Sequence, residues 1–154
     1  MLLCCFTRCL PRPLLAAARR GLRTVVGGVL GGGLEKVQMT LVLRADLGMG
    51  KGKLCAQASH GTLNAYRAAV QGGQTSLEAL QQWELTGQGK VVVRAESEAQ
   101  LLELWQACQD RGLPCSVVRD AGLTQITCGS ITCLAIGPAR ADLISEVTGG
   151  LRLL

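Results

Sequence analysis

Short apolar runs alternate along the chain with longer stretches in which apolar residues recur three or four positions apart. The short runs are rich in β-branched residues and predict strands at 38–44, 90–95, 115–118 and 131–136. The longer stretches have helical spacing and predict helices at 53–71, 76–83, 97–111 and 141–147. The predicted order of elements is therefore β-α-α-β-α-β-β-α.

This order predicts an α/β fold with a small sheet flanked by helices. Helices connect the first three predicted strands, which favours parallel neighbours, whereas the short connection before the fourth favours an antiparallel pair. The apolar run KVVVRA at 90–95 is typical of a strand covered on both faces. Ser76 is the expected N-cap of the second helix, and Gly112 is placed to end the third. We expect one mixed sheet of four strands.

The composition fits a single globular domain. The chain has 154 residues, of which 48% are hydrophobic and 18% charged, and its glycines follow no triplet period. These values exclude a disordered chain, a collagen and a polytopic membrane protein. The net charge of +5 is concentrated at the N-terminus, because residues 1–34 hold five arginines and no acid. The rest of the chain is formally neutral, so its net charge gives no reason to expect a general affinity for polyanions.

Residues 1–36 have the composition of a targeting segment. A helix over 14–24 would place leucine and alanine on one face and three arginines on the other. Arginine-rich, acid-free amphipathic leaders are typical of mitochondrial transit peptides, so we expect a mitochondrial protein, with the cytoplasm as the second choice. A disordered tail and a membrane-surface anchor are the alternatives. The glycine-rich run at 24–34 is too short to span a bilayer and is expected to be a disordered linker before a domain at 37–154.

Cysteine and histidine are not spaced for a metal site or a redox motif. Three of the eight cysteines lie in the leader, and the other five form no CxxC pair. His60 is the only histidine, so we expect neither a metal nor a cofactor. The cysteines outside the leader are expected to be reduced, buried thiols: Cys55, Cys108, Cys115, Cys128 and Cys133.

The turn into the first predicted helix is the first candidate site. Its glycines, Gly48, Gly50 and Gly52, precede a helix whose first backbone N–H groups and positive dipole end attract anions. Lys51 and Lys53 add two ammonium groups there. The turn matches neither a Walker A loop nor a dinucleotide-binding fingerprint. We therefore expect an anion site of another kind.

One face of the same helix carries four polar side chains. Their spacing is i, i+4, i+7 and i+11, and they are Lys53, Gln57, His60 and Asn64. Such a stripe also describes a solvated helix face. Its position beside the glycine-rich turn favours a binding or catalytic site.

The second candidate site follows the third predicted strand. Asp120 ends that strand, and the chain turns at the next two residues. Chemistry in α/β proteins concentrates at strand ends. We therefore expect Asp120 and Thr124 to meet across the turn, where the carboxylate would orient a hydroxyl or a water. The alternative is that each side chain hydrogen-bonds only within its own turn.

Three stretches carry a resemblance to a known family. They are LRADLGMGKGKLCAQASHGTLNAY, QWELTGQGKVVV and RDAGLTQITCGSITCLAIGPARADLISEVTGGLRLL, and together they resemble type 2 peptidyl-tRNA hydrolases over residues 37–154. The resemblance implies a hydrolase that cleaves the ester joining a peptide, or an N-blocked aminoacyl group, to the 3′ ribose of tRNA. It also implies a compact α/β domain with a mixed four-stranded sheet, often a dimer, with peptidyl-tRNA as its partner.

The resemblance assigns roles to residues at both candidate sites. The positions that match the family's active site are Lys53, Gln57, His60, Asp120 and Thr124, while Lys51 and Gln125 also match its motifs. The chain departs from the family's pattern at Gly48, Cys55, Leu123 and Cys128, where lysine, alanine, a basic or polar residue and proline are common. Two cations are thereby lost, which weakens the expected attraction of tRNA phosphates.

Ester hydrolysis needs an attacking water, stabilisation of the oxyanion and a proton for the leaving oxygen. We expect Asp120, with Thr124, to position and deprotonate the water. Lys53 is expected to stabilise the developing negative charge, and Gln57 to orient the ester or the terminal adenosine. His60 is either a proton shuttle or a structural histidine between helix and sheet.

Several residues near the first two strands and the first helix are candidate contacts for the tRNA. They are Arg44, Lys51, Lys53, Arg67, Lys90 and Arg94, and Gln125, further along the chain, is another candidate because it matches a motif of the family. Two other functions stay open: a mitochondrial interaction scaffold that keeps the fold with weak or no hydrolysis, and a tRNA-binding module without chemistry. The complete set of polar site residues favours the enzyme.

Overall fold

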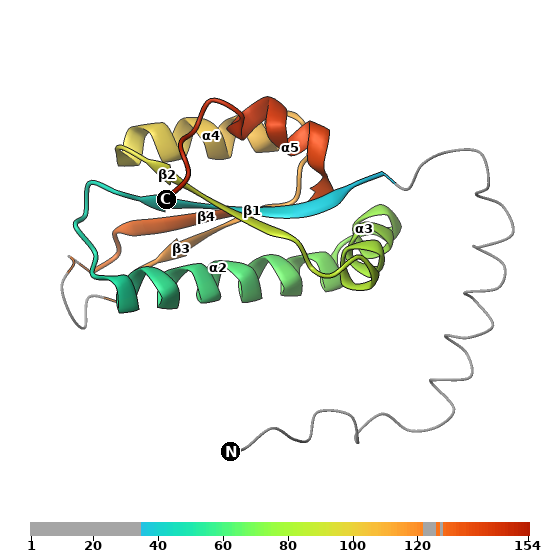
Figure 1. The fold of residues 1–154 in the computed structure, drawn as a ribbon, viewed down its shortest axis with the longest axis horizontal. Coiled ribbons are helices and arrows are strands. Elements are labelled where there is room, and N and C mark those ends of the chain that lie inside the picture. Colours follow the sequence, from blue (N-terminus) through green and yellow to red (C-terminus); the bar gives the residue numbers. More distant parts are fainter. Residues whose placement is uncertain (1–34, 122–125, 127) are drawn as a thin grey trace, which may run out of the picture. The chain divides into compact units, whose positions relative to one another are not determined.

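The computed structural model describes residues 35–121, 126 and 128–154, so the predicted leader, Thr124 and Gln125 lie outside the described residues. The described part contains the expected strands and helices in the expected order. Their bounds are β1 (Val37–Arg44), α2 (Lys51–Gln71), α3 (Gln74–Leu85), β2 (Lys90–Ala95), α4 (Glu98–Asp110), β3 (Cys115–Arg119), β4 (Ile131–Arg140) and α5 (Ala141–Thr148) (Figure 1). The α/β fold predicted from the apolar pattern is confirmed.

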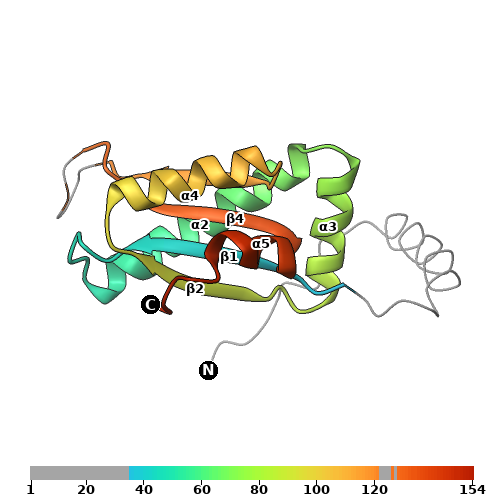
Figure 2. The same cartoon turned by 90° about the horizontal axis from the view of Figure 1, so that it is seen from above.

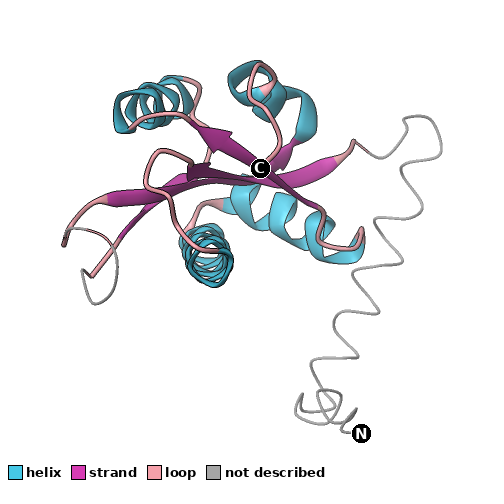
Figure 3. Ribbon diagram, turned by 60° about the vertical axis from the view of Figure 1, so that its left-hand side comes forward, coloured by secondary structure: helices cyan, strands magenta, loops and turns pink. Residues whose placement is uncertain are grey.

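The four strands form one mixed sheet with helices on both faces. The strand order is β2-β1-β4-β3, in which β1 and β2 are parallel while β4 is antiparallel to both of its neighbours. Helices α2 and α3 cover one face, and α4 and α5 cover the other (Figures 1 and 2). Since β1, β2 and β3 all point the same way, their carboxyl ends meet at one end of the sheet. Figure 3 shows the three layers edge on.

The core follows the two-residue period of the strands. Leu41 and Leu43 of β1 pack in the cluster that contains α2 and α3, whereas Val42 between them packs in the cluster of α4 and α5. Every residue of β1 is buried, because the strand lies in the middle of the sheet. Full burial of one such side chain contributes about 1.5–3 kcal/mol. The two clusters therefore hold helices to both faces of the sheet.

Helix α2 lies against the sheet through its smallest residues. Gly61, Ala65 and Ala69 are its buried apolar positions, one turn apart. A Cβ atom at Gly61 would lie 2.9 Å from the Sγ of Cys133 and 3.5 Å from the Cβ of Ala135, so only glycine permits this approach. This close packing brings the polar face of α2 next to the edge of the sheet.

Two helices begin earlier than the sequence pattern predicts. Helix α2 starts at Lys51 rather than Lys53, because the backbone N–H of Leu54 already donates to the carbonyl of Gly50. Helix α3 starts at Gln74 with Gly73 as its N-cap, so Ser76 is inside the first turn and is not the cap. In both cases a glycine, read from the sequence as a loop residue, is the first residue before the helix.

Strand β4 continues through Gly137 and Pro138, where the sequence predicts an end. Gly137 has φ of 96°, and a Cβ there would lie 2.7 Å from the carbonyl oxygen of Gln38. Glycine alone fits this conformation and this contact. Beyond it, Ala139 and Arg140 still pair with β1 across a bulge. The longer strand therefore depends on a glycine that looks like a strand breaker.

The β2 edge of the sheet is covered by the chain itself. The N–H of Arg94 donates to the carbonyl of Arg152, and the N–H of Leu154 donates to the carbonyl of Val92. Val92 and Val93 pack in opposite core clusters, as expected for a strand with both faces covered, although β2 is an edge strand and only partly buried. Among the described residues no helix is both long and apolar enough to cross a membrane.

Candidate active site

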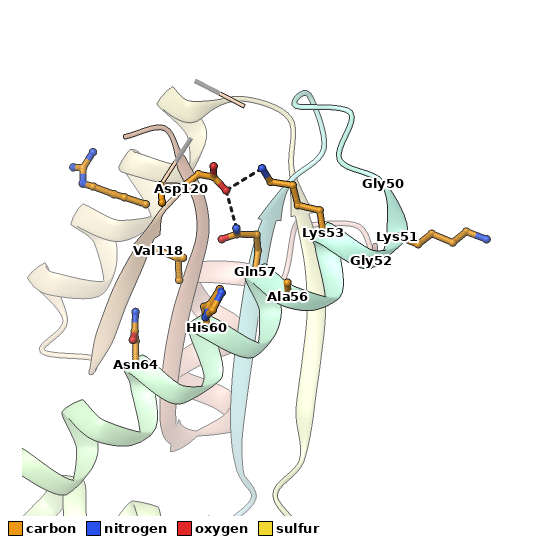
Figure 4. A pocket seen from close by; sticks show the side chains of 12 residues that line it. Gly50, Lys51, Gly52, Lys53, Ala56, Gln57, His60, Asn64, Val118 and Asp120 are labelled. Atoms are coloured by element: carbon orange, nitrogen blue, oxygen red, sulfur yellow. Dashed lines mark hydrogen bonds and ion pairs between the residues drawn. The ribbon is translucent and has the colours of Figure 1, made fainter. Parts of the chain in front are cut away.

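The two candidate sites of the sequence come together in one pocket. The beginning of α2 and the end of β3 meet at the end of the sheet where three strands finish, and they enclose a pocket of about 830 Å³ (Figure 4). Its lining residues are Gly50, Lys51, Gly52, Lys53, Ala56, Gln57, His60, Asn64, Val118, Arg119, Asp120 and Ala121. All four members of the predicted polar stripe face this pocket.

The Asp120 carboxylate is the centre of the polar contacts in the pocket. Its Oδ2 atom lies 3.0 Å from the Nζ of Lys53 and accepts a 2.9 Å hydrogen bond from the Nε2 of Gln57. The Lys53 and Asp120 side chains are only 12% and 7% exposed. Charges this shielded from water need partners, and here each supplies the other. The contacts lead across to α2, so Asp120 is more than a cap for its own turn.

The backbone on both sides holds the carboxylate in place. Asp120 follows β3 directly and lies two residues after Val118, whose side chain packs in the α2 cluster, so both face α2. The N–H of Asp120 donates to the carbonyl of Ser130, and its own carbonyl accepts from the N–H of Gly129. The carboxylate is thus fixed on a strand end rather than on a loose loop.

Thr132 is a site residue that the sequence reasoning missed. Its buried hydroxyl donates to the Oε1 of Gln57 at 2.7 Å. With its oxygen held in this way, the Gln57 amide directs its Nε2 toward Asp120. A chain of contacts therefore runs from Thr132 through Gln57 to the carboxylate.

A β-bulge explains why Thr132 faces the pocket. Val118 pairs with Cys133 but the next residue, Arg119, pairs with Ile131, so Thr132 is the extra residue on β4. Strict alternation would place Thr132 on the α4 side with Leu134. Bulges re-aim single side chains, and this one turns the hydroxyl toward α2. No simple pattern in the sequence reveals that shift of register.

His60 and Asn64 lie further along the same pocket. They follow Gln57 on successive turns of α2 and face β3 (Figure 4). His60 is exposed and lines the pocket, and its role as a proton shuttle or as a structural histidine stays a prediction. Thr124 and Gln125, the two other predicted site residues, lie outside the described part of the chain.

Comparison with known proteins identifies one family. The profile of "Peptidyl-tRNA hydrolase PTH2" matches residues 37–154. A protein of Methanocaldococcus jannaschii named peptidyl-tRNA hydrolase is 42% identical over 118 residues, which are 77% of this chain and 100% of that protein. The chain belongs to the PTH2 family.

Two mammalian relatives carry a location in their names. The mouse protein "Peptidyl-tRNA hydrolase 2, mitochondrial" is 43% identical over 143 residues, covering 93% of this chain and 77% of the relative. The bovine protein of the same name is 50% identical over 116 residues, which are 75% of this chain and 63% of that relative. The resemblance drawn from the residues, including the hydrolase class, is confirmed by this membership.

Two of the cations proposed to contact tRNA in this PTH2 member are engaged elsewhere. Arg44 is buried and paired with Asp46 and Glu98. The hydrogen bond to Asp46 is the largest cause that raises the pKa of Arg44, and the same bond lowers the pKa of Asp46. Arg44 therefore anchors the end of β1, and its burial and ion pairs do not support the predicted contact with a phosphate.

Lys90 has partners away from the pocket, and its contact with tRNA stays a prediction. It pairs with Met39 near the start of β1, at the end of the sheet opposite the pocket. Its Nζ donates to the carbonyl of Gln88 and lies 4.6 Å from the ring centre of Trp83. Lys51 and Arg67 are exposed on α2, and Lys51 points away from Asp120 (Figure 4). These two remain candidates for tRNA contacts in the PTH2 pocket region.

The cysteines of the described part are all free thiols. Cys108 and Cys133 are buried as predicted, whereas Cys55 and Cys128 are exposed, contrary to the prediction. Burial raises the pKa of Cys133 to about 12, so this thiol stays protonated. Within the described ranges no group of three or more His, Cys, Asp or Glu side chains is placed to hold a metal ion.

Proposed function

We propose that this protein hydrolyses the ester between a peptide, or an N-blocked aminoacyl group, and the 3′ ribose of tRNA, and that the Asp120 pocket is the hydrolytic centre. The observation that carries this proposal is the shielded carboxylate of Asp120, which contacts Lys53 and Gln57 near the N-terminus of α2. Membership in the PTH2 family supports the reaction class.

Asp120 acts first as a general base. Its carboxylate orients a water and accepts one proton from it, while the water oxygen forms a bond to the ester carbonyl carbon. The carbonyl oxygen becomes an oxyanion, and the ammonium group of Lys53 stabilises that charge from within the shielded pocket. Gln57 keeps the carboxylate in position and can also donate to the ester. Thr124 belongs to this set as a predicted partner of the water.

The tetrahedral intermediate then collapses. The bond between the carbonyl carbon and the 3′ oxygen of the ribose breaks, and the electron pair goes to that oxygen. Asp120 returns its proton to the leaving oxygen, so the peptide leaves as an acid and the tRNA leaves with its hydroxyl restored. The cycle consumes one water and regenerates the carboxylate.

The beginning of α2 binds the phosphates of the tRNA 3′ end. The helix starts after Gly50 with no side-chain cap, so the N–H groups of its first turn and the positive end of its dipole face a ligand. Lys51 adds a cation there, and Arg67 continues the exposed side of the helix. Such contacts read the backbone and the chain end, not base sequence, so affinity falls steeply with salt.

Residues 1–36 serve as a mitochondrial transit peptide and linker, and residues 37–154 carry the activity. Residues 1–34 hold five arginines and no acid, which supports this assignment, as do the names of two relatives. Import of the full chain into isolated mitochondria tests it. A homodimer is part of the same proposal, and analytical ultracentrifugation measures it.

The function is tested by release of N-acetylalanine from N-acetyl-alanyl-tRNA by the purified full chain. We expect multiple turnovers, with the freed tRNA able to be charged again. A folded protein that leaves the ester intact would contradict the proposal and favour the interaction scaffold. Binding of tRNA without turnover would favour the tRNA-binding module.

Replacing Thr132 with valine is expected to lower kcat about tenfold with little change in KM. The substitution keeps the shape of the side chain and removes the hydroxyl that holds Gln57, so the amide loses its orientation toward Asp120. Steady-state kinetics on N-acetyl-alanyl-tRNA measures the effect. Thr132→Ser keeps the hydroxyl and should restore most of the rate, whereas equal loss in both variants would refute the positioning role.

A further inference from the structure

Strand β3 forms the second edge of the sheet, and its outer side pairs with no strand in the described part of the chain. The N–H of Gly137 donates to the carbonyl of Pro114, which sets the alternation of bonds along β3 and β4. The backbone groups of Ser116 and Val118 then face β4, while those of Cys115, Val117 and Arg119 face outward. This edge differs from the β2 edge, which residues 152–154 cover.

The open edge leads directly into the pocket. Asp120 is the first residue after β3, and Val118 lies across the pocket from the polar face of α2 (Figure 4). Arg119 also lines the pocket. From Lys53 to Asn64 that face extends about 16 Å at ~1.5 Å per residue. An extended chain of about five residues covers the same length. The pocket therefore adjoins the open edge of β3 at Val118 and Arg119, and we call the pocket and this edge together the groove.

We propose that the peptide part of the substrate binds in this groove as an extended strand added parallel to β3. The inference rests on the proposed function, since it takes Asp120 as the place where the ester is cleaved. The ester is at the carboxyl end of the peptide, and Asp120 is at the carboxyl end of β3. A peptide with its last residue there and its chain along the edge must run in the same direction as β3.

The chemistry along the groove favours a peptide over RNA. Two of the three cations in the lining, Lys51 and Lys53, are at the beginning of α2, and the third, Arg119, donates to the carbonyl of Gly129. Further along, Asn64 offers both a donor and an acceptor, which suits peptide amides, and Val118 is apolar. Recognition through backbone groups accepts any peptide sequence, as strand addition does in other proteins.

The test compares N-acetylated oligoalanyl-tRNAs with one to five alanines on the full chain. We expect kcat/KM to rise about tenfold over this series, because each residue adds backbone hydrogen bonds to β3. N-methylation of single amides in the longest peptide should lower kcat/KM at every second position, because alternate residues of an added strand face β3. Equal rates at all lengths, or N-methyl effects without alternation, would overturn the proposal.

A variant of the protein gives an independent test. Val117→Pro removes an outward N–H that the β3–β4 pairing does not use, a place where edge strands tolerate proline. The proline variant should abolish the rise of kcat/KM with peptide length and leave the hydrolysis of N-acetyl-alanyl-tRNA unchanged. The matched control Val117→Ala keeps the N–H and should keep the rise with length. If the proline variant does not fold, the N-methylated substrates decide the question on the unchanged protein.

Other occupants of the groove give different results. Loss of activity on the one-residue substrate in Asn64→Ala, with the length gain intact, would assign the groove to RNA. A dimer that Val117→Pro separates into monomers would assign the edge to a second copy of the chain. Either result overturns the inference and leaves the proposed function standing. No hydrolysis of any substrate would refute the proposed function itself, and the inference with it.

Discussion

Replacing Asp120 with asparagine is expected to lower kcat on N-acetyl-alanyl-tRNA by about 1,000-fold. The amide has nearly the same shape but cannot take a proton from water, and loss of a general base costs about 10²–10⁴-fold. The Lys53 ammonium also loses the carboxylate 3.0 Å away that balances its charge in a shielded site. Single-turnover release of labelled N-acetylalanine measures the rate, and far-UV circular dichroism shows whether the variant remains folded.

The control for this variant is Asp142→Asn. Asp142 is also an aspartate in an ion pair, with Arg140, but it lies in the first turn of α5 on the opposite face of the sheet from α2. Its hydrogen bond to Arg140 lowers its pKa, so it too is normally ionised. We expect the control to keep its rate within about twofold. A folded Asp120→Asn protein with near-normal turnover would remove Asp120 from the mechanism.

Replacing Gly61 with valine is expected to lower the free energy of unfolding by about 3 kcal/mol. The added Cβ would lie 2.9 Å from the Sγ of Cys133, and both side-chain methyl groups would enter the closest contact between α2 and β4. Helix α2 would have to move away from the sheet, which lengthens the hydrogen bond between Gln57 and Thr132. Turnover should therefore fall together with stability, as urea unfolding and the hydrolysis assay will measure.

Gly52→Val is the matched control for the effect on stability. Gly52 is in the first turn of the same helix, and no atom lies within 4 Å of a Cβ built there. Both variants replace a glycine of α2 with valine, so the larger part of their difference reports the contact with β4. We expect the control to stay within about 0.5 kcal/mol of the unchanged protein. Equal destabilisation of both would show that the close contact contributes nothing.

Much of the fold follows from local sequence because each element agrees with its own pattern. The run at 38–44 predicts β1, and the apolar spacing over 97–111 predicts α4, which begins at Glu98 with Ser97 as its N-cap. The spacing from Lys53 to Asn64 predicts one helix face, and the end of a strand predicts the place of Asp120. The mixed sheet brings this helix face and Asp120 together. Its parallel pair, β1 with β2, and its antiparallel pair, β3 with β4, were also predictable from the connections between the strands.

The parts that sequence reasoning missed depend on contacts between distant segments. Thr132 reaches Gln57 only because one residue is inserted in the pairing of β3 and β4, and the pattern of apolar residues does not record that shift. Arg44 was expected at a phosphate because one of its two partners, Glu98, belongs to a distant segment, although the other, Asp46, is only two residues away. Lys90 was a candidate tRNA contact, but its distance from the pocket depends on the pairing of β2 with β1, which places Lys90 at the opposite end of the sheet.

The central pair of strands has a consequence for how the protein folds. β1 and β4 are neighbours, although α2, α3, β2, α4 and β3 come between them along the chain. Pairings this distant form slowly, because a long loop must close before they contribute stability. Lys53 and Gln57 come before that loop's midpoint, and Asp120 and Thr132 come after it. A partly folded chain therefore has no assembled pocket, and activity returns on refolding only when the whole sheet is complete.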